Sequence, residues 1–140
     1  MSPLASGVAL LLAAMHGDVY VADGATLVIS GTPVQMAGID VPHLGSSDGD
    51  LARAELRTIL EGQLVMCRST GERAGARVFA YCQVDGADIG AEMVARGYAL
   101  DCAIQSQGRY RELEPADSRD RLVQSARCVV LEGAATEARP

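Results

Sequence analysis

Four cysteines are the residues of this chain with the clearest chemistry, because thiols can pair with each other or bind a metal. They are Cys67, Cys82, Cys102 and Cys128, separated by 15, 20 and 26 residues. No two have the C-x-x-C spacing of common zinc sites, so the pattern does not favour a metal. We predict the disulfides Cys67–Cys82 and Cys102–Cys128, the sequential option among three connectivities. The alternative is four small buried thiols in a reduced protein.

Each predicted disulfide requires the two elements that carry its cysteines to lie close together. Cys67 and Cys82 lie on two predicted strands, residues 63–68 and 77–84, which we expect to be antiparallel neighbours joined by a loop over residues 69–76. Cys102 follows the last strand-like segment, and Cys128 closes the predicted final helix. The second bridge would therefore fasten the C-terminal segment onto the rest of the domain.

Composition limits the classes of protein that fit. A chain of 140 residues is long enough for one domain with one core. Hydrophobic residues make up 49% and charged residues 21%, which excludes disorder over the whole chain. The net charge is −6, with twelve arginines and no lysine. Proteins that bind nucleic acid by neutralising phosphates are normally basic, so only a local cluster of arginines would support such binding here.

Residues 19–42 predict three short strands. Apolar residues alternate with smaller or polar ones, as in strands with one buried face; they are Val19, Val21, Leu27, Ile29, Val34 and Met36. Asp23-Gly24 and Ser30-Gly31 predict the turns between the strands. Pro42 ends the third strand, because the residue before a proline is kept out of the helical region and the chain turns there.

Two helices are expected around the later strands. The first follows a polar loop over residues 43–50, with Asp48 or Asp50 as its N-cap and Gly62 just past its end. Its predicted apolar face is Ala52, Leu56, Ile59 and Leu60. The second begins at Asp88 and stops at Gly97. Five strands with a helix after the third have the layout of an oligonucleotide-binding (OB) type barrel.

Pro115 interrupts the C-terminal segment. One continuous helix there would place Pro115 in its interior, at a cost of about 3 kcal/mol. We therefore predict a turn that ends at Glu114 and a new helix that begins with Pro115 and runs over residues 117–126. The apolar residues available to this segment are Tyr110, Leu113, Leu122 and Val123.

The N-terminal residues 4–15 are apolar but too few to span a bilayer. They fit the hydrophobic region of an export signal, although no Lys or Arg precedes them and the cleavage pattern is only fair. The alternatives are a buried N-terminal strand and a mis-assigned start. We expect a signal or apolar segment over residues 1–17, a domain over 18–130 and a flexible tail over 131–140, in a periplasmic or secreted protein without a transmembrane segment.

Four short motifs in this order give the chain a family resemblance. They are D-G-A-T at 23–26, G-I-D-V-P-H at 38–43, G-A-R-V at 75–78 and A-R-G-Y-A at 95–99. Residues 19–97 thereby resemble the staphylococcal-nuclease-like (thermonuclease) family. The resemblance implies a five-stranded, mainly β OB-type barrel with two to three helices.

The resemblance also implies a calcium-dependent phosphodiesterase site. In that site two aspartates hold Ca²⁺, a glutamate acts on the attacking water, and two arginines stabilise the phosphate. Asp40 corresponds to the second aspartate and Arg77 to the second arginine. Ala25 stands in place of the first aspartate, Gln35 in place of the first arginine, and His43 in place of the glutamate.

The candidate residues have structural explanations as well as functional ones. The metal candidates are Asp23, a nearby substitute carboxylate, and Asp40; both are also common turn residues. The substrate-binding candidates are Arg77 and Gln35, and the catalytic candidates are Arg77 and His43, although an arginine on a strand and a loop histidine are most often solvated. Ca²⁺ takes six to eight oxygens, so one or two carboxylates make a weak site.

Loss of a general base typically lowers a rate by about 10²–10⁴. We therefore expect a catalytically inactive binding or interaction module without a cofactor, whose partner is a protein or a weakly bound single-stranded nucleic acid. The alternative is a Ca²⁺-dependent nuclease with a rearranged site made of Asp23, Asp40, His43 and Arg77; a structural envelope protein is a third. Convergence of these four side chains around a pocket would favour the enzyme.

Overall fold

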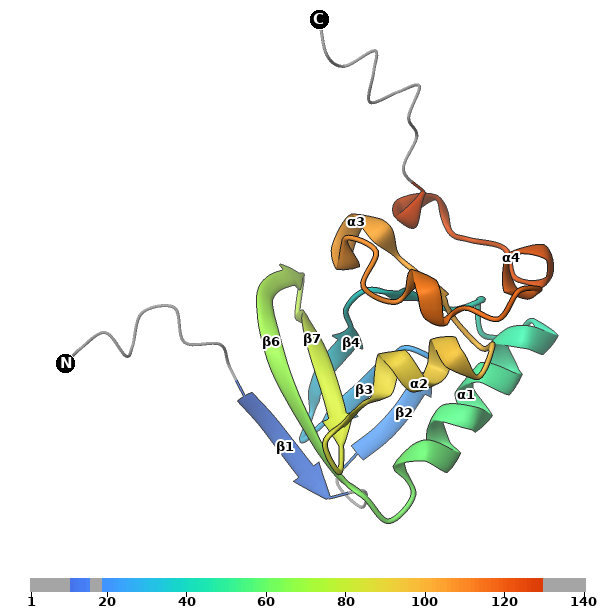
Figure 1. Ribbon diagram of the computed structural model, residues 1–140. Coiled ribbons are helices and arrows are strands. Elements are labelled where there is room, and N and C mark those ends of the chain that lie inside the picture. Colours follow the sequence, from blue (N-terminus) through green and yellow to red (C-terminus); the bar gives the residue numbers. More distant parts are fainter. Residues whose placement is uncertain (1–10, 16–18, 130–140) are drawn as a thin grey trace, which may run out of the picture.

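The computed structural model describes residues 11–15 and 19–129 and has a mixed α+β fold (Figure 1). The strands of its main sheet are β1 (Leu11–Met15), β2 (Val19–Asp23), β3 (Thr26–Ile29), β4 (Thr32–Met36), β6 (Leu64–Ala74), β7 (Arg77–Val84) and β8 (Ala87–Asp88). A second, two-stranded sheet pairs β5 (Ile39–Asp40) with β9 (Leu100–Asp101). The longer helices are α1 (Ser47–Leu60) and α2 (Ile89–Ala95).

The main sheet has the order β1-β6-β7-β4-β3-β2, with β8 added to β7. Its neighbours are antiparallel except for β4 and β7, which are parallel. The prediction of five strands in one sheet is confirmed, since β2, β3, β4, β6 and β7 all belong to it. In the part of the chain described, this path runs from β1 to β2 without closing, so the α+β class is shown and a closed barrel is not.

The predicted loop over residues 69–76 is wrong. Strand β6 continues to Ala74 and pairs with β7 up to Arg77, with a register irregularity between Ser69 and Arg73. The tip of this hairpin is exposed on both faces, so its residues lack the alternation of apolar and polar types that identifies a half-buried strand. Backbone pairing with β7 maintains the strand there. The Thr70 side chain adds a hydrogen bond from its Oγ1 to the Phe79 carbonyl over 3.3 Å.

Helix α1 confirms the predicted apolar face, with Ala52, Leu56 and Leu60 buried and Ile59 partly buried. Its N-cap, however, is Ser46, whose Oγ accepts the Gly49 N–H over 3.0 Å. Asp48 and Asp50 lie in the first turn instead, where a negative charge interacts favourably with the helix dipole. Asp50 Oδ1 accepts the Gly45 N–H over 2.9 Å and so fixes the loop before the helix.

Helix α2 confirms the prediction made from Asp88 and Gly97. Asp88 is its N-cap and accepts the Ala91 N–H over 3.1 Å, and Gly97 follows its end with a φ of +85°. The buried side chains of α2 are Ile89, Met93 and Val94. They join the core that the inner faces of the sheet and of α1 build.

The C-terminal region contains only short helices. They are α3 (Ala103–Ser106), the 3₁₀ turn η3 (Arg111–Leu113), α4 (Ser118–Arg121) and the 3₁₀ turn η4 (Ala126–Cys128). The predicted helix over 117–126 is therefore wrong in length. After α4 the backbone is extended, and Val123 is 87% exposed and Leu113 43% exposed, whereas Tyr110 and Leu122 are buried. Contacts to distant parts of the chain, described below, hold this extended segment.

The apolar N-terminal segment falls partly outside the described residues. Leu11–Met15 forms β1, which pairs antiparallel with β6 over residues 64–68. The remaining residues of the predicted 1–17 segment, and the predicted tail over 131–140, lie outside the described ranges. Among the residues that the structure describes, no helix is long and apolar enough to cross a membrane.

Both predicted disulfides are confirmed. Cys67 and Cys82 face each other across β6 and β7, with an S–S distance of 2.07 Å. Cys102 and Cys128 are joined over 2.10 Å and attach η4 to the segment after β9. Structural disulfides are typical of oxidising compartments, which fits the expected periplasmic or secreted location.

Candidate functional site

The five residues predicted for the site line one pocket of about 380 Å³. Asp23 lies at the end of β2, Gln35 on β4, Asp40 on β5, His43 in the loop before α1 and Arg77 at the start of β7. Strand pairing brings them together: β4 lies between β3 and β7, and β5 continues the chain directly beyond β4. The geometry that would favour an enzyme is therefore partly present, and the hydrogen bonds of each residue decide what the pocket can do.

Asp40 is buried and is satisfied by residues from the far end of the chain. Its carboxylate is 4% exposed and accepts two hydrogen bonds from Ser125, from the backbone N–H to Oδ2 over 2.7 Å and from Oγ to Oδ1 over 2.6 Å. The guanidinium of Arg127 lies 3.9 Å from Oδ1. The predicted metal ligand thus has both oxygens engaged by internal donors and an internal cation beside it.

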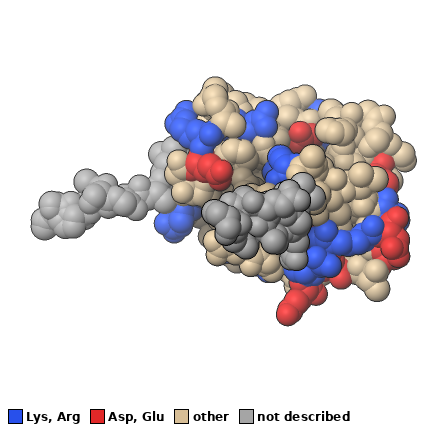
Figure 2. Space-filling model, turned by 90° about the horizontal axis from the view of Figure 1, so that it is seen from above, with Lys and Arg blue, Asp and Glu red and all other residues tan. Residues whose placement is uncertain are grey.

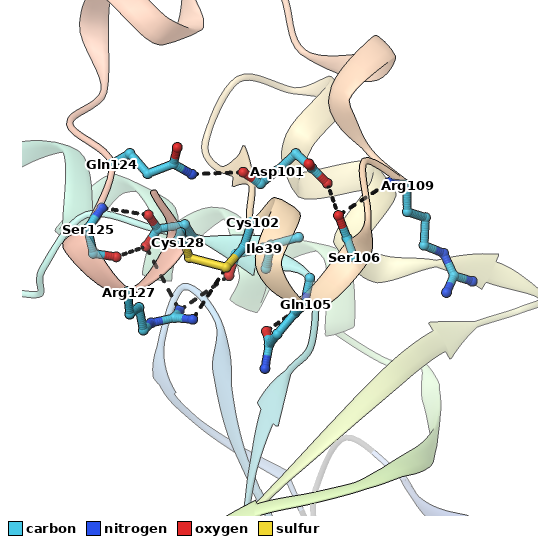
Figure 3. The surroundings of a disulfide bond; sticks show 12 residues. Ile39, Asp101, Cys102, Gln105, Ser106, Arg109, Gln124, Ser125, Arg127 and Cys128 are labelled. Carbon is cyan, nitrogen blue, oxygen red and sulfur yellow. Dashed lines mark hydrogen bonds and ion pairs between the residues drawn. A yellow bond between two sulfur atoms is a disulfide. The ribbon is translucent and has the colours of Figure 1, made fainter. Parts of the chain in front are cut away.

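These donors belong to residues 122–128, which we call the C-terminal strap. Figure 3 shows Ser125, Arg127 and Cys128 of the strap around the disulfide to Cys102. Arg127 also contacts the Cys102 Sγ and the Ile39 carbonyl, each over 3.5 Å. The disulfide and these contacts hold Arg127 at the edge of the pocket, where its side chain is 44% exposed.

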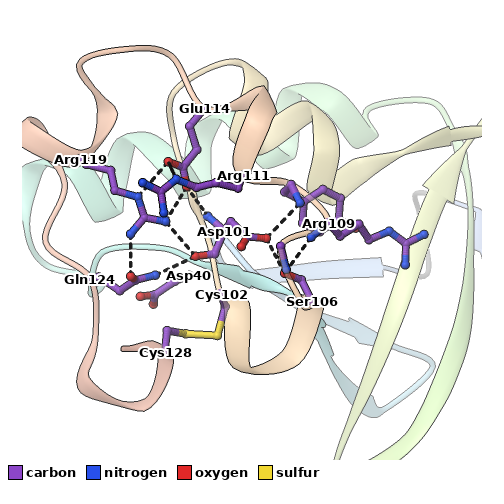
Figure 4. Close-up of polar contacts among 12 residues, drawn as sticks. Asp40, Asp101, Cys102, Ser106, Arg109, Arg111, Glu114, Arg119, Gln124 and Cys128 are labelled. Atoms are coloured by element: carbon purple, nitrogen blue, oxygen red, sulfur yellow. Dashed lines mark hydrogen bonds and ion pairs between the residues drawn. A yellow bond between two sulfur atoms is a disulfide. The ribbon is translucent and has the colours of Figure 1, made fainter. Parts of the chain in front are cut away.

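A polar network holds the start of the strap. Gln124 donates to the Asp101 carbonyl over 2.8 Å and accepts from Arg119 over 2.8 Å, as Figure 4 shows. Arg119 also pairs with Glu114 over 2.7 Å. Glu114 is 5% exposed and receives the Asp101 N–H over 2.8 Å. The segment around β9 is thereby fixed to the strap on the side away from the disulfide.

Two opposing effects set the ionisation of Glu114. Burial raises the pKa of this carboxyl, because it disfavours the charged form. Hydrogen bonds from Arg119 and from the Asp101 backbone, together with the charges of Arg119 and Arg111, favour the carboxylate. The hydrogen bonds and charges outweigh burial, so the pKa of Glu114 lies below its ordinary value.

The other predicted residues have mainly structural contacts. Asp23 Oδ1 accepts the Ala25 N–H over 2.8 Å, as a turn aspartate does. Gln35 is 7% exposed, and its Oε1 accepts from Arg77 Nη1 over 2.7 Å, so the two substrate-binding candidates bind each other. His43 is exposed, and its backbone carbonyl accepts bonds from the N–H and the hydroxyl of Ser46.

The described residues hold no group of three His, Cys, Asp or Glu side chains that could bind a metal ion. Asp23 and Asp40 line the same pocket, but each carboxylate already accepts internal hydrogen bonds. A hard cation such as Ca²⁺ requires several free oxygens. It would also lie close to the guanidinium of Arg127.

The sequence reasoning missed Ser125 and Arg127. Ser125 is 85 positions from its partner Asp40, and no local pattern connects two such distant residues. One signal was available, because the predicted Cys102–Cys128 bridge places residues next to Cys128 beside the segment that pairs with β5. Following that bridge would have brought Arg127 close to Ile39 and Asp40.

Charged side chains of both signs are interspersed on one face of the molecule. On the face of the molecule seen from above, arginines form separate clusters with acidic side chains between them (Figure 2). The part of this face that the described residues form has no continuous basic surface of the kind that tracks a nucleic-acid backbone.

Comparison with known proteins does not assign a family. No protein-family model matches the chain, and no curated protein sequence matches it. The likeness to staphylococcal-nuclease-like proteins stays a prediction that rests on the motifs of residues 19–97.

Proposed function

We propose that this protein is a non-catalytic binding module built on a nuclease-like scaffold. The proposal rests on the contacts of Asp40. Its two carboxylate oxygens accept hydrogen bonds from Ser125, and the guanidinium of Arg127 lies beside its negative charge. Hydrogen bonds to charged groups contribute about 1.5–3 kcal/mol each, so a metal ion would have to displace two of them. The residues present favour an internal cation over a bound one.

The scaffold we propose is an OB-type barrel of the staphylococcal-nuclease-like kind. Five of its strands fall in the predicted segments, and α1 follows the third of them. An OB-fold is a partly open five-stranded barrel, which is compatible with the open strand path of the main sheet. We further propose export to the periplasm or the exterior, since two disulfides would persist there.

The partner we propose is a protein or a weakly bound single-stranded nucleic acid. The net charge of −6 opposes polyanions at long range. Arg77 and Arg127 line the same pocket and attract anionic groups only at short range. Binding of nucleic acid would therefore be weak and would decrease as salt is added.

One observation favours the second candidate, a Ca²⁺-dependent nuclease that cleaves DNA or RNA with a rearranged site. Asp23, Asp40, His43 and Arg77 all line one pocket, as such a site requires. His43 is exposed, and an imidazole can accept a proton near neutral pH. This candidate requires the strap to leave Asp40 before a metal can bind.

A nuclease assay on single-stranded DNA with Ca²⁺, with Mn²⁺ and with a chelator tests the proposal. We expect the wild-type protein to produce no more cleavage than a protein-free sample in all three conditions. Cleavage with Ca²⁺ that disappears in Asp40→Ala or Arg77→Ala would establish the nuclease instead. Arg57→Ala, an exposed change on α1 outside this pocket, is the matched control.

A restoration series tests why the site is inactive. The variant Ala25→Asp, Gln35→Arg, His43→Glu introduces the residues that the family pattern requires. We expect it to cleave poorly while the strap engages Asp40, and to gain activity when Ser125→Ala and Arg127→Gln are added. A restored variant that is fully active with an intact strap would show that the strap does not block the pocket.

A further inference from the structure

We propose that the outer face of the β6–β7 hairpin binds an extended segment of a partner protein, with an acidic residue at one end and a basic residue at the other. This face bears a groove made of two adjoining hollows of about 370 and about 270 Å³, which share Met66, Gln83 and Gly86. Among the described residues, none that lines the Asp40 pocket also lines this groove. The inference rests on the proposed function for the kind of partner, a protein, and it names the surface and the chemistry of that partner.

The alternation of side chains along the two strands produces this face. Cys67 and Cys82 are buried in the core, so the residues next to them on each strand point outward. The outward residues that line the groove are Leu64, Met66 and Arg68 on β6 and Tyr81 and Gln83 on β7. A strand rises about 3.3 Å per residue, so positions 64 to 68 span about 13 Å. This length matches five residues of extended peptide.

Arg68 and Arg109 form the positive end of the groove. Arg109 lies over the Tyr81 ring, 4.1 Å from its centroid, and Figure 4 shows its side chain extending away from Asp101. A stacked guanidinium keeps N–H donors available at its edge, in the planar fork that suits a carboxylate. Arg68 is exposed and has no ion pair within the part of the chain that the structure describes.

These two guanidiniums lie beside a single carboxylate. Asp88 Oδ2 accepts the Tyr110 hydroxyl over 2.7 Å and lies 3.8 Å from Arg109 Nη2. One positive charge therefore remains at this end of the groove, and an acidic side chain of a partner would balance it. Tyr110 is buried, and its ring lies 6.5 Å from that of Tyr81, so the wall that holds Arg109 is formed before a partner binds.

The rest of the groove is first apolar and then acidic. Leu64 is 45% exposed and Met66 is partly buried, and both line the part of the groove next to the turn Asp85-Gly86. Asp85 is exposed and gives this end the opposite charge. Every second side chain of an extended peptide faces the same surface. The groove therefore suits a segment in which acidic, apolar and basic residues occupy alternate positions.

The same charges favour a protein over a nucleic acid as the partner. A single-stranded nucleic acid has a negative phosphate at every nucleotide, and the carboxylates of Asp85 and Asp88 would repel such a chain along the groove. The net charge of −6 opposes a polyanion at long range as well. A peptide can place one acidic residue at the arginines and a basic residue at Asp85.

Titration with synthetic peptides, followed by heteronuclear NMR, tests the groove. The probes are the acetylated and amidated peptides Glu-Thr-Leu-Thr-Lys and Lys-Thr-Leu-Thr-Glu, which present the pattern in the two chain directions. We expect at least one of them to bind saturably and to shift the amide signals of residues 64–68 and 81–88. The rearranged peptide Leu-Glu-Lys-Thr-Thr places its two charges on opposite faces, so it should bind about tenfold more weakly or less.

Substitutions on both partners test the contact between the acidic residue and the arginines. Arg68→Gln and Arg109→Gln should each weaken binding of the better peptide about fivefold or more, because each removes a charged hydrogen-bond donor. A peptide with glutamine in place of glutamate should bind the wild type more weakly and lose little further affinity in these variants, because the contact is already absent. Arg57→Gln, an exposed change beside β2 and outside the groove, should leave the affinity unchanged.

Several results would overturn the inference. Unchanged affinity in Arg68→Gln is one, and it is decisive even if Arg109→Gln disturbs the loop that carries it, because Arg68 is exposed on a strand. Equal losses for the glutamate and glutamine peptides in the arginine variants are another. A third is binding of oligothymidylate, and of neither peptide, at the amides of residues 64–68 and 81–88.

The inference and the proposed function fail in different ways. A protein that neither cleaves DNA nor binds the two peptides overturns the groove and leaves the non-catalytic proposal in place. Cleavage of DNA that depends on Asp40 overturns the non-catalytic proposal. Peptide binding at residues 64–68 in that same protein would still support the groove, because the groove and the Asp40 pocket share no lining residue among those described.

Discussion

A buried carboxylate needs donors, and at Asp40 the backbone and the hydroxyl of Ser125 supply them. The residue that the resemblance predicts as a metal ligand thus holds the C-terminal strap. Gln35, predicted to stand in place of the first arginine of the family pattern, is also engaged internally, because its amide oxygen accepts from Arg77. At the scale of single residues, the side chains of Asp40 and Gln35 serve as hydrogen-bond acceptors for other residues of the chain.

Gly49 illustrates how closely the loop beside the pocket packs against α1. A Cβ at this position would lie 1.8 Å from the His43 carbonyl oxygen and 2.9 Å from that of Pro42, and backbone atoms cannot easily move away. We expect Gly49→Ala to lower the free energy of unfolding by at least about 2 kcal/mol, as measured by urea denaturation. Ser47→Ala, an exposed change two residues earlier, should stay within about 0.5 kcal/mol of the wild type.

Glu114 makes the stability of the strap region depend on pH. Its pKa is lower in the folded protein than in the unfolded chain, so its contribution is present above the unfolded pKa, about 4.3. The contribution is lost as pH falls through the folded pKa, because the unfolded chain then binds the proton first.

We therefore expect Glu114→Gln to be less stable than the wild type at pH 7. The difference between the two proteins should shrink as the pH is lowered to about 3, below the unfolded pKa. Urea unfolding midpoints across this range measure the effect. Glu112→Gln, an exposed change in the 3₁₀ turn that Glu114 follows, is the control. A difference that is constant with pH would contradict the assignment to the carboxylate.

At the scale of elements, the strap is a segment held mainly by distant contacts. Helix α4, directly before the strap, and η4, within it, have four and three residues, too few to be stable alone. Ser125, Gln124 and Arg127 attach it to residues 39–40 and 101–102, and the Cys102–Cys128 bridge closes a loop of 26 residues.

Removal of this bridge should loosen the strap before the sheet. In the chain-entropy description a disulfide of this span contributes about 3 kcal/mol. For Cys102→Ala/Cys128→Ala we expect faster amide hydrogen exchange over residues 118–129, with protection retained in β3, β4 and β7. Equal loss of protection in the strap and the sheet would show that the two unfold together.

The elements that could be predicted from the sequence are those whose pattern is local. Alternating apolar residues identified β2, β3 and β4, and the apolar face of α1 followed a helical period. The tip of β6 lacked such a pattern, because both of its faces are exposed. Competition from tertiary contacts shortened the last helix, since Gln124 and Ser125 bind residues far along the chain instead of continuing a helical turn.

The residues of the candidate site could be predicted from the sequence, but some of their contacts could not. Motifs placed Asp23, Gln35, Asp40, His43 and Arg77 together, and the structure brings all five to one pocket. The contacts of Asp40 could not be predicted from the family motifs, because Ser125 and Arg127 come from the region beyond residue 97, where these motifs end.

At the scale of the whole molecule, the protein should respond little to calcium. A ligand stabilises a protein only if it binds the native state, and here the carboxylates of the pocket already have internal partners. We expect millimolar Ca²⁺ to leave Tm unchanged relative to Mg²⁺ at equal ionic strength. A rise in Tm with Ca²⁺ that is absent in Asp40→Asn would indicate a working metal site.

The position of the strap at the end of the described chain determines when the pocket can first exist. Asp40 leaves the ribosome 85 residues before Ser125, so the nascent chain has the carboxylate long before it has the donors that satisfy it. The contacts around Asp40 can therefore form only after the C-terminal strap has been synthesised, and the same holds for the Cys102–Cys128 bridge. A molecule without this bridge should have a folded sheet and a pocket that lacks Ser125 and Arg127.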